Sequence, residues 1–536
     1  MVAERIFING NIYTVNNEKP YAEAMAVSGQ DLIYVGDTAG AMALVGPGTE
    51  VVDLEGKTVL PGLIENHIHP IQVGVLMEEV DADKKSKEDI LAFVKAKAEE
   101  IPEGGFIGGF GWNQELWEDN QFPSKEDLDS VAPNHYVVLA RTCGHAYWLN
   151  SKAMEKAGIT EDIQNPVGGE FVRKPDGTLL GVLTDTACEW VQGIMPEYTV
   201  EDIKRITLKV QDRLVSFGMV GASDMGVLNS VYESRLNITV KAMEELHAED
   251  KLKVRSYLYV VPGEELEEAY ARGPQIGLLD DRLTIRGQKL FADGALGARS
   301  AWLLDDYCDR PGHCGNGRLA DDELYGYLKR AQDHGFQTTC HCIGDAAVKQ
   351  MLDACEKLGL EDRDDRMRIE HFMIVREEDF ARMGRMKMVT SMQFVELSSD
   401  LNMVEDRIGK ERVKGAYAWR KILNAGGVIA AGSDHPIDNM NPFESLYFAV
   451  SRCSIHEEPK GGYYPEQALT RYEALKAYTL DGAYARFEEK RTGSLEVGKH
   501  ADFIVIDRDY FECPLKEIKD IKVLRTVIGG ETVYQK

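Results

Sequence analysis

The chain has 536 residues, and 61 Lys and Arg against 89 Asp and Glu give it a formal net charge of −28. A surface this acidic repels phosphate, so we expect neither nucleic acid nor an anionic membrane as an obligate partner. The sequence has no run of 18 apolar residues, and MVAERIFING lacks the basic segment and apolar core of a secretion signal. Its nine cysteines are odd in number and include no CxxC pair, which indicates reduced thiols. We therefore expect a cytoplasmic protein that acts on a small molecule.

Both ends of the chain have the pattern of short strands separated by turns. RIFINGNIYTV near the N-terminus contains an Asn-Gly turn signal, and VLRTVIGGETVYQK near the C-terminus contains a Gly-Gly turn. Each end is too small to bury a core by itself. We therefore expect residues 1–57 and 486–536 to pair in one small β-sandwich.

From residue 58 to residue 485, apolar strand-like runs alternate with amphipathic helical stretches, which is typical of a parallel sheet built from βα units. Eight such runs are present: Val59 to His67, Met219 to Asp224, Val254 to Val260, Ile285 to Ala292, Gln337 to Cys342, Met367 to His371, Met388 to Gln393 and Val428 to Asp434. Eight runs predict an α/β fold with a closed (β/α)8 TIM barrel.

About 150 residues separate the first run from the second, which is too long for one βα connection. This stretch has helical and Gly-rich segments of its own, such as GGFIGGFGW. We therefore expect an inserted subdomain over about residues 71–199, after the first barrel strand.

Side chains able to bind a metal follow several of the predicted strands. His67 and His69, in LPGLIENHIHP, are two residues apart and so share one face of a strand. An HxH pair alone is also typical of two ordinary histidines at a strand end. However, His341, His371 and Asp434 occupy the carboxyl ends of three further runs. Since the catalytic groups of a βα barrel come from the carboxyl ends of several strands, these residues predict a metal site at the barrel mouth.

Lys289, in IRGQKLFADGALGAR, is a candidate sixth ligand. An ammonium group cannot bind a metal, and a lysine that ends a strand at the surface is the simpler interpretation. Reaction with CO₂ would convert the amine to a carbamate, whose two anionic oxygens could bridge two cations. The lysine therefore brings CO₂ into the hypothesis as a co-reactant.

Five motifs, in order along the chain, resemble the signatures of the amidohydrolase superfamily: PGLIENHIHP, KLFADGALGARSA, HCIGDAAV, RIEHF and GSDHP. In the insert, GWNQELW, GHAYWLNSKAMEKAGI and GVLTDTA are similar to the branch that contains N-substituted formamide deformylases and YtcJ-like proteins. GSLEVGKHADFIVID resembles the C-terminal β segment of that branch. The resemblance thus covers nearly the whole chain.

This resemblance implies a role for each candidate ligand. It implies that His67 and His69 bind the more buried cation and that carboxylated Lys289 bridges to a second one. It further implies that His341 and His371 bind the second cation. Zinc is the expected metal, with one or two ions per chain, although imidazole also suits iron and nickel.

The resemblance also implies a hydrolase that cleaves an amide or formamide-like C–N bond other than a peptide bond. Asp434 would bind metal and act as the general acid/base: it would accept a proton from metal-activated water and return it to the leaving nitrogen. A homodimer is the assembly that the resemblance implies.

Further residues are candidates for contact with the substrate. His145, in CGHAYWLN, would help to stabilise an oxyanion, with an ordinary helix-start histidine as an equal alternative. Arg299 would hold a substrate carbonyl or carboxylate, with a surface ion pair as the alternative. Four aromatic residues would line an apolar pocket or belong to the core: Trp112, Trp148, Trp302 and Phe394.

Two other functions stay open. A fold does not fix the bond that is cleaved, so a metal-dependent esterase, lactonase or deaminase on the same barrel is the first alternative. A catalytically inactive binding protein is the second. It would be expected to lack ligands, whereas all six candidate positions hold residues competent to bind a metal.

Overall fold

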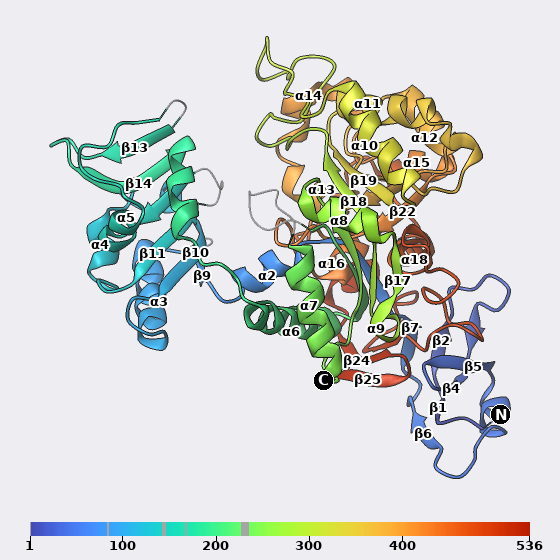
Figure 1. The fold of residues 1–536 in the computed structure, drawn as a ribbon. Helices are drawn as coiled ribbons and strands as arrows, with labels where there is room; N and C mark the ends of the chain where they lie inside the picture. Colours follow the sequence, from blue (N-terminus) through green and yellow to red (C-terminus); the bar gives the residue numbers. More distant parts are fainter. Residues whose placement is uncertain (1, 83–84, 142–145, 167–168, 227–234) are drawn as a thin grey trace. The chain divides into compact units, whose positions relative to one another are not determined.

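The computed structural model describes residues 2–82, 85–141, 146–166, 169–226 and 235–536. The chain forms two compact units (Figure 1). One consists of Met1–Pro70 with Thr207–Lys536, and the other of Ile71–Ile206. Within the described ranges, none of the helices has the length and apolar character needed to span a bilayer.

The first unit contains a barrel of eight parallel strands, which lie side by side in chain order. They are β8 (Leu63–Ile68), β15 (Met219–Asp224), β16 (Arg255–Val260), β18 (Leu283–Phe291), β19 (Gln337–Cys342), β20 (Arg368–His371), β21 (Val389–Met392) and β22 (Val428–Ala431). A short strand, β17 (Gln275–Gly277), pairs antiparallel with β18. The predicted TIM-barrel fold class is confirmed.

The last strand meets the first through a few specific hydrogen bonds. The backbone N–H of Asp434 donates to the carbonyl of His67 at 2.8 Å. The side-chain amide of Asn66 donates to the carbonyl of Ala431 at 3.1 Å. These bonds close the barrel at its carboxyl end, where the candidate ligands lie.

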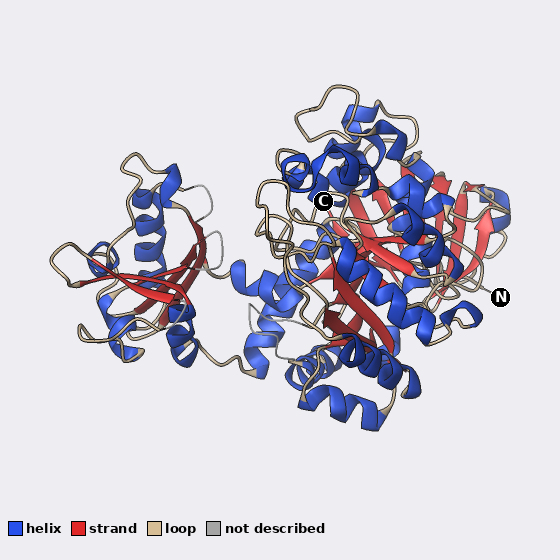
Figure 2. Ribbon diagram, turned by 90° about the horizontal axis from the view of Figure 1, so that it is seen from above, coloured by secondary structure: helices blue, strands red, loops and turns tan. Residues whose placement is uncertain are grey.

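Helices connect the barrel strands or follow the last of them, and they lie outside the barrel (Figure 2). They include α7 (Leu236–Ala248), α8 (Glu264–Arg272), α10 (Asp321–Asp333), α11 (Asp345–Lys357), α12 (Glu377–Arg385), α15 (Trp419–Asn424), α16 (Pro442–Ser451), α17 (Arg471–Ala477) and α18 (Leu480–Ala485). The residues of α11 show why such segments are helical: Ala347, Met351 and Cys355 recur every four residues and are fully buried. This spacing places an apolar stripe on one face of the helix, against the strands.

Both chain ends contribute to the predicted β-sandwich, which belongs to the same unit. One sheet has the order β5-β4-β1-β6, and the other has the order β25-β24-β23-β7-β2-β3. The strands are β1 (Arg5–Ile8), β2 (Asn11–Tyr13), β3 (Tyr21–Ala22), β4 (Ala24–Ser28), β5 (Asp31–Gly36), β6 (Glu50–Asp53), β7 (Thr58–Pro61), β23 (Phe503–Ile506), β24 (Val523–Ile528) and β25 (Glu531–Gln535). The rings of Phe7 and Phe503 pack edge to face in its core, with centroids 4.8 Å apart.

The first predicted barrel run is in fact two strands. β7 belongs to the sandwich and pairs with β23, whereas β8 begins the barrel. Gly62 lies between them. A Cβ atom at this position would lie 2.4 Å from Cγ1 of Val220, so the chain can cross from one sheet to the other only where a side chain is absent.

The second unit is the insert, and it has its own sheet and core. The six strands have the order β13-β14-β12-β11-β10-β9. Their bounds are β9 (Val80–Asp81), β10 (Phe106–Trp112), β11 (Tyr136–Arg141), β12 (Ala146–Leu149), β13 (Gly169–Arg173) and β14 (Leu179–Asp185), with helices α3 (Lys87–Glu100), α4 (Lys125–Asp129) and α5 (Ser151–Lys156). The insert therefore packs as a compact body between the first and second barrel strands in the sequence.

Candidate metal centre

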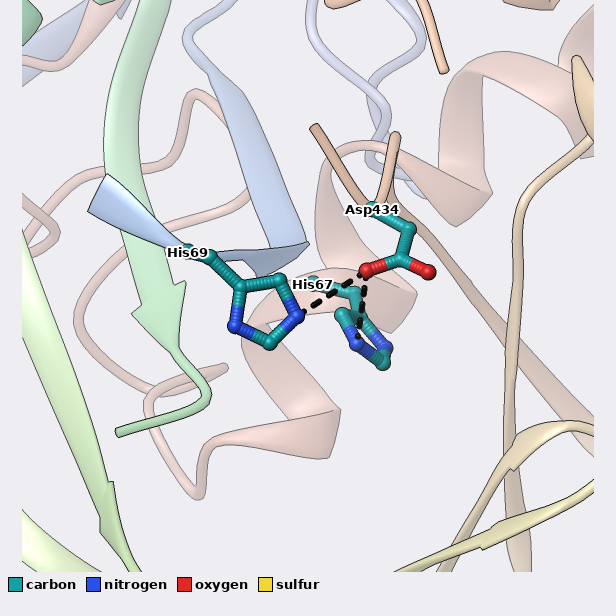
Figure 3. Close-up of side chains that lie close together, drawn as sticks. All are labelled: His67, His69 and Asp434. Carbon is teal, nitrogen blue, oxygen red and sulfur yellow. Dashed lines mark hydrogen bonds and ion pairs between the residues drawn. The ribbon is translucent and has the colours of Figure 1, made fainter. Parts of the chain in front are cut away.

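Three of the predicted ligands meet around one carboxylate oxygen (Figure 3). Oδ1 of Asp434 lies 3.2 Å from Nε2 of His67 and 3.1 Å from Nε2 of His69. His67 is in β8, His69 follows β8, and Asp434 follows β22. The closure of the barrel between these two strands is what brings residues so distant in sequence together.

His371 joins the same centre from β20. Its ring centroid lies 5.2 Å from that of His67 and 4.5 Å from that of His341. His371, Glu396 and Asp434 form a second group whose ligand atoms lie within 4.8 Å of one another. Two adjacent groups thus share Asp434.

The backbone turns sharply at His371. Glu370 faces the barrel interior, so regular strand alternation would point the next side chain outward. His371 instead has φ = 71°, in the left-handed region that few non-glycine residues adopt. Asp434 has φ = 56°. Strained conformations cluster at functional sites, and here two candidate ligands adopt them.

Glu370 fixes the orientation of His67. Its Oε2 lies 2.5 Å from Nδ1 of His67, which leaves Nε2 directed at Asp434. Arg368 donates from Nε to Oε1 of Glu370 at 2.9 Å, and the hydroxyl of Thr339 donates to the same oxygen. Burial opposes ionisation of Glu370, but Arg368 and His67 outweigh it and hold the pKa of Glu370 well below its ordinary value.

Glu396 orients His371 as Glu370 orients His67. Its Oε1 lies 2.9 Å from Nδ1 of His371. Burial, followed by the charge of Asp434, raises the pKa of Glu396 well above its ordinary value. Sequence reasoning missed both glutamates. The motif RIEHF signalled Glu370 only as a neighbour of His371, and Glu396 lies in a segment without a recognisable motif.

Among the described residues, His341 is positioned by Asp293 and Gly294 and not by a glutamate. Its Nε2 lies 3.4 Å from Oδ1 of Asp293 and 3.3 Å from the carbonyl of Gly294. Burial, followed by the charge of His371, lowers the pKa of His341 well below its ordinary value. The imidazole is therefore neutral at physiological pH, which is the form that binds metals.

Lys289 lies in β18 and is almost fully buried, with 1% of its surface exposed. The interpretation as a surface lysine is therefore wrong. Burial lowers the pKa of Lys289 below its ordinary value. A neutral amine is the nucleophilic form of lysine, and its pKa shifts readily when the residue is buried.

The donor set fits a divalent cation. Burial lowers the pKa of His67, but Asp434 and Glu370 outweigh this effect and raise it, so the carboxylates favour positive charge at this position. Nδ1 of His69 is buried and has no hydrogen-bond partner among the described residues. Imidazole nitrogens and carboxylate oxygens, with further carboxylates that orient the imidazoles, are the ligands and supporting groups typical of zinc and related metals.

Trp112 and Trp148 belong to the core of the insert. Both indoles are fully buried. The indole N–H of Trp112 donates to the carbonyl of Leu139, and that of Trp148 to the carbonyl of Ser124, each at 2.8 Å. Packing of the insert thus accounts for both side chains, which was the alternative to a pocket role.

The other predicted substrate contacts have different positions. Arg299 forms an ion pair with Asp309 at 2.8 Å and is partly exposed, as its alternative interpretation predicted. Phe394 is fully buried, and its ring centroid lies 4.8 Å from that of Trp419. Trp302 is half-buried, and its backbone N–H donates to Asp293. His145 lies outside the described residues.

Comparisons with known proteins show the family to which the chain belongs. A profile described as "Amidohydrolase family" matches residues 50–534. Putative amidohydrolase YtcJ of Bacillus subtilis (strain 168) is 32% identical over 99% of this chain and 99% of its own length. N-substituted formamide deformylase of Arthrobacter pascens is 27% identical over 99% of this chain and 98% of its own. The crystal structure of an uncharacterized metal-dependent hydrolase from Pyrococcus furiosus has a TM-score of 0.80 and 30% identity, covering 95% of this chain and 100% of that one. The chain therefore belongs to the amidohydrolase family, in the branch of the formamide deformylases and YtcJ-like proteins.

Proposed function

We propose that this hydrolase uses a divalent metal to cleave an amide or formamide-like C–N bond in a small molecule. The observation that carries the proposal is the meeting of His67 and His69 at Oδ1 of Asp434. The relative named N-substituted formamide deformylase supports a C–N bond as the target, because its name describes removal of the formyl group from an N-substituted formamide.

The ligands divide between the two groups of side chains. His67, His69 and Asp434 would hold one cation. His371 and Asp434, with His341 beside His371, would hold a second, and Glu396 would orient His371. A bound divalent cation supplies Lewis acidity toward a carbonyl and lowers the pKa of water toward about 7. Zinc is the metal that we propose first, since imidazole and carboxylate ligands suit it.

Asp434 would move the proton. Burial opposes its ionisation, but His67 and His69 outweigh it and hold the pKa of Asp434 well below its ordinary value. The carboxylate is therefore ionised at neutral pH and can accept a proton from attacking water. It would then return that proton to the leaving nitrogen, which is a poor leaving group until it is protonated.

Lys289 would bridge the two cations after carboxylation. The neutral amine nitrogen attacks the carbon of CO₂, an N–C bond forms as one C–O π bond opens and leaves its electron pair on oxygen, and the nitrogen releases one proton to solvent. Burial supports this step because it lowers the pKa of Lys289 and so favours the neutral amine. The resulting carbamate offers two anionic oxygens, the ligand type that two-metal hydrolases need.

A matched pair of substrates tests the choice of bond. An N-alkylformamide and the formate ester of the same alkyl group differ only in the leaving atom. We expect the zinc-loaded protein to hydrolyse the formamide with the larger rate enhancement over the uncatalysed reaction. A larger enhancement for the ester would favour the esterase alternative, and release of ammonia from amino-heterocycles alone would favour a deaminase.

A further inference from the structure

Gln393 is a buried polar residue that no part of the proposed mechanism uses. It directly follows β21, at the carboxyl end of the seventh barrel strand, and is 1% exposed. Oε1 and Nε2 of its side chain are both buried and have no hydrogen-bond partner among the described residues. Buried polar groups are nearly always paired, and an unpaired one is costly. A bound ligand that forms hydrogen bonds to this carboxamide would explain why a polar residue occupies the position.

The strand register places Gln393 on the interior face of the barrel. Glu370 pairs with Ser391 in the parallel ladder between β20 and β21. The carboxylate of Glu370 contacts His67, so this face of the two strands points inward. Gln393 is two residues beyond Ser391, so its side chain is on the same inward face of the strand, closer to the mouth of the barrel.

The next strand fixes the height of Gln393 in the barrel. The backbone N–H of Gly432 donates to the carbonyl of Met392 at 3.1 Å, which continues the ladder and sets Gly432 level with Gln393. A Cβ atom on Gly432 would lie 3.0 Å from Cβ of His67. Gln393 thus lies at the same height in the barrel as the candidate metal centre, and it follows β21, the strand next to β22.

The backbone of Gln393 is hydrogen-bonded to a residue that orients one of the candidate metal ligands. Its carbonyl accepts from the N–H of Glu396 at 3.1 Å, and the carboxylate of Glu396 orients His371. Phe394, the pocket residue predicted from the sequence, is on the opposite face and packs against Trp419. The inward side chain in this segment is therefore a carboxamide and not an aromatic ring.

We propose that Gln393 anchors the substrate by a pair of hydrogen bonds to a planar edge that carries N–H and C=O side by side. A carboxamide has both donors and an acceptor, so a ligand that satisfies both must offer the complementary pair. Primary amides, lactams, cyclic imides and ureides have such an edge. This inference rests on the proposed function, and it predicts that amides able to present N–H and C=O on one edge bind more tightly than amides that cannot.

Succinimide and N-methylsuccinimide are the probes that test the anchor. They share a ring and both carbonyls, but only succinimide has the N–H. Their affinities for the zinc-loaded protein are to be measured by calorimetry, without reference to turnover. We expect the wild-type protein to bind succinimide about tenfold more tightly, which is the size of one net hydrogen bond of about 1.4 kcal/mol.

Gln393→Met keeps the length of the side chain and removes both polar atoms. We expect it to bind the two probes equally and to melt at or above the wild-type temperature, because the amide has no partner to lose among the described residues. The matched control is Gln350→Met, whose amide donates to the carbonyl of Leu319 and to Asp321, each at 2.8 Å. This control should melt lower and keep the preference for succinimide.

Three outcomes would overturn the inference. One is a wild-type protein that binds both probes equally. Another is a preference for succinimide that persists in Gln393→Met, which would mean that the N-methyl group weakens binding for steric reasons. The third is a melting temperature of Gln393→Met as low as that of Gln350→Met, which would mean that the amide is already paired within the protein. If instead the protein does not cleave C–N bonds, the rates for the N-alkylformamide and the formate ester will show this. The preference for succinimide in the binding experiment would be unaffected.

Discussion

Glu370 and His67, which are 303 residues apart in sequence, make a 2.5 Å contact between a carboxylate oxygen and Nδ1. The contact leaves Nε2 of His67 directed at Asp434 in the candidate metal centre. Carboxylates that orient a metal-binding histidine typically contribute 10-fold to 100-fold to metal affinity. We therefore expect metal binding to depend on residues beyond the six that the sequence indicated.

Replacement of Glu370 by Gln tests this orienting role. The amide keeps the shape of the side chain but loses the negative charge that holds His67, so we expect zinc affinity to fall by about 10-fold to 100-fold. Competition with a chromophoric chelator measures the loss. Thr339→Val, which removes only a hydroxyl bonded to Glu370, is the control and should lose much less. Wild-type affinity in Glu370→Gln would show that the contact does not orient the ligand.

Asp434→Asn tests the proton transfer. The amide cannot accept a proton from water, so we expect kcat to fall by at least about 100-fold, which is the usual contribution of a general base. The far-ultraviolet circular dichroism spectrum should be unchanged, because the side chain is isosteric. Turnover near that of the wild type, with metal content intact, would refute the role.

Lys289→Ala tests the bridge. We expect the variant to lose activity and at least one cation per chain, since no carbamate can form, and to recover part of the activity when short carboxylates such as acetate or propionate are added. Elemental analysis gives the metal content. Retention of both cations in Lys289→Ala would count against a bridging lysine.

The pair formed by Arg255 and Asp502 joins barrel strand β16 to the β-sandwich, and it predicts how stability depends on pH. Nε of Arg255 lies 2.8 Å from Oδ2 of Asp502, and the two side chains are 4% and 1% exposed. Burial opposes ionisation of Asp502, but Arg255 outweighs it and lowers the pKa of Asp502 from 3.8 to about 2. The folded state therefore binds this proton less readily than the unfolded chain does.

It follows that Asp502 contributes about 2.5 kcal/mol to the free energy of unfolding above about pH 4, and that this contribution is lost as the pH falls toward 2. Asp502→Asn should lose that pH dependence and destabilise the protein by about 3–5 kcal/mol, because Arg255 stays buried without a counter-charge. Denaturant titrations between pH 2 and pH 7 measure both effects. Asp333→Asn, which disrupts an exposed pair with Lys329, is the control and should cost about 1 kcal/mol or less. Equal losses in the two variants would contradict the prediction.

Much of the barrel was predictable because its strands are short apolar runs that recur between amphipathic helices. The exception was the run from Val59 to His67, where two adjacent strands belong to different sheets. The dipeptide Pro61-Gly62 is a turn signal within it, and the structure divides the run there, where a side chain at Gly62 would meet Val220. Contacts of this kind lie between segments far apart in the sequence, so periodicity carries no signal for them.

The candidate ligands were predictable for a related reason: parallel strands end at one rim, so His67 and Asp434 had to be near each other. The groups that surround them were not. Gln393 and Phe394 are adjacent in sequence, and only the register of β21 shows which of them faces inward. Arg299 looked like a substrate contact because it follows a Gly-rich turn, yet Asp309 pairs with it at the surface.

The metal content of the purified protein, measured together with its activity before and after chelation, tests the central claim most directly. We predict one or two equivalents of a divalent metal per chain, loss of hydrolysis when a chelator removes it, and recovery when zinc is returned. We also predict that His67→Ala and His69→Ala bind less metal than the wild type. Full activity in metal-free protein, or undiminished metal binding in both histidine variants, would contradict the account.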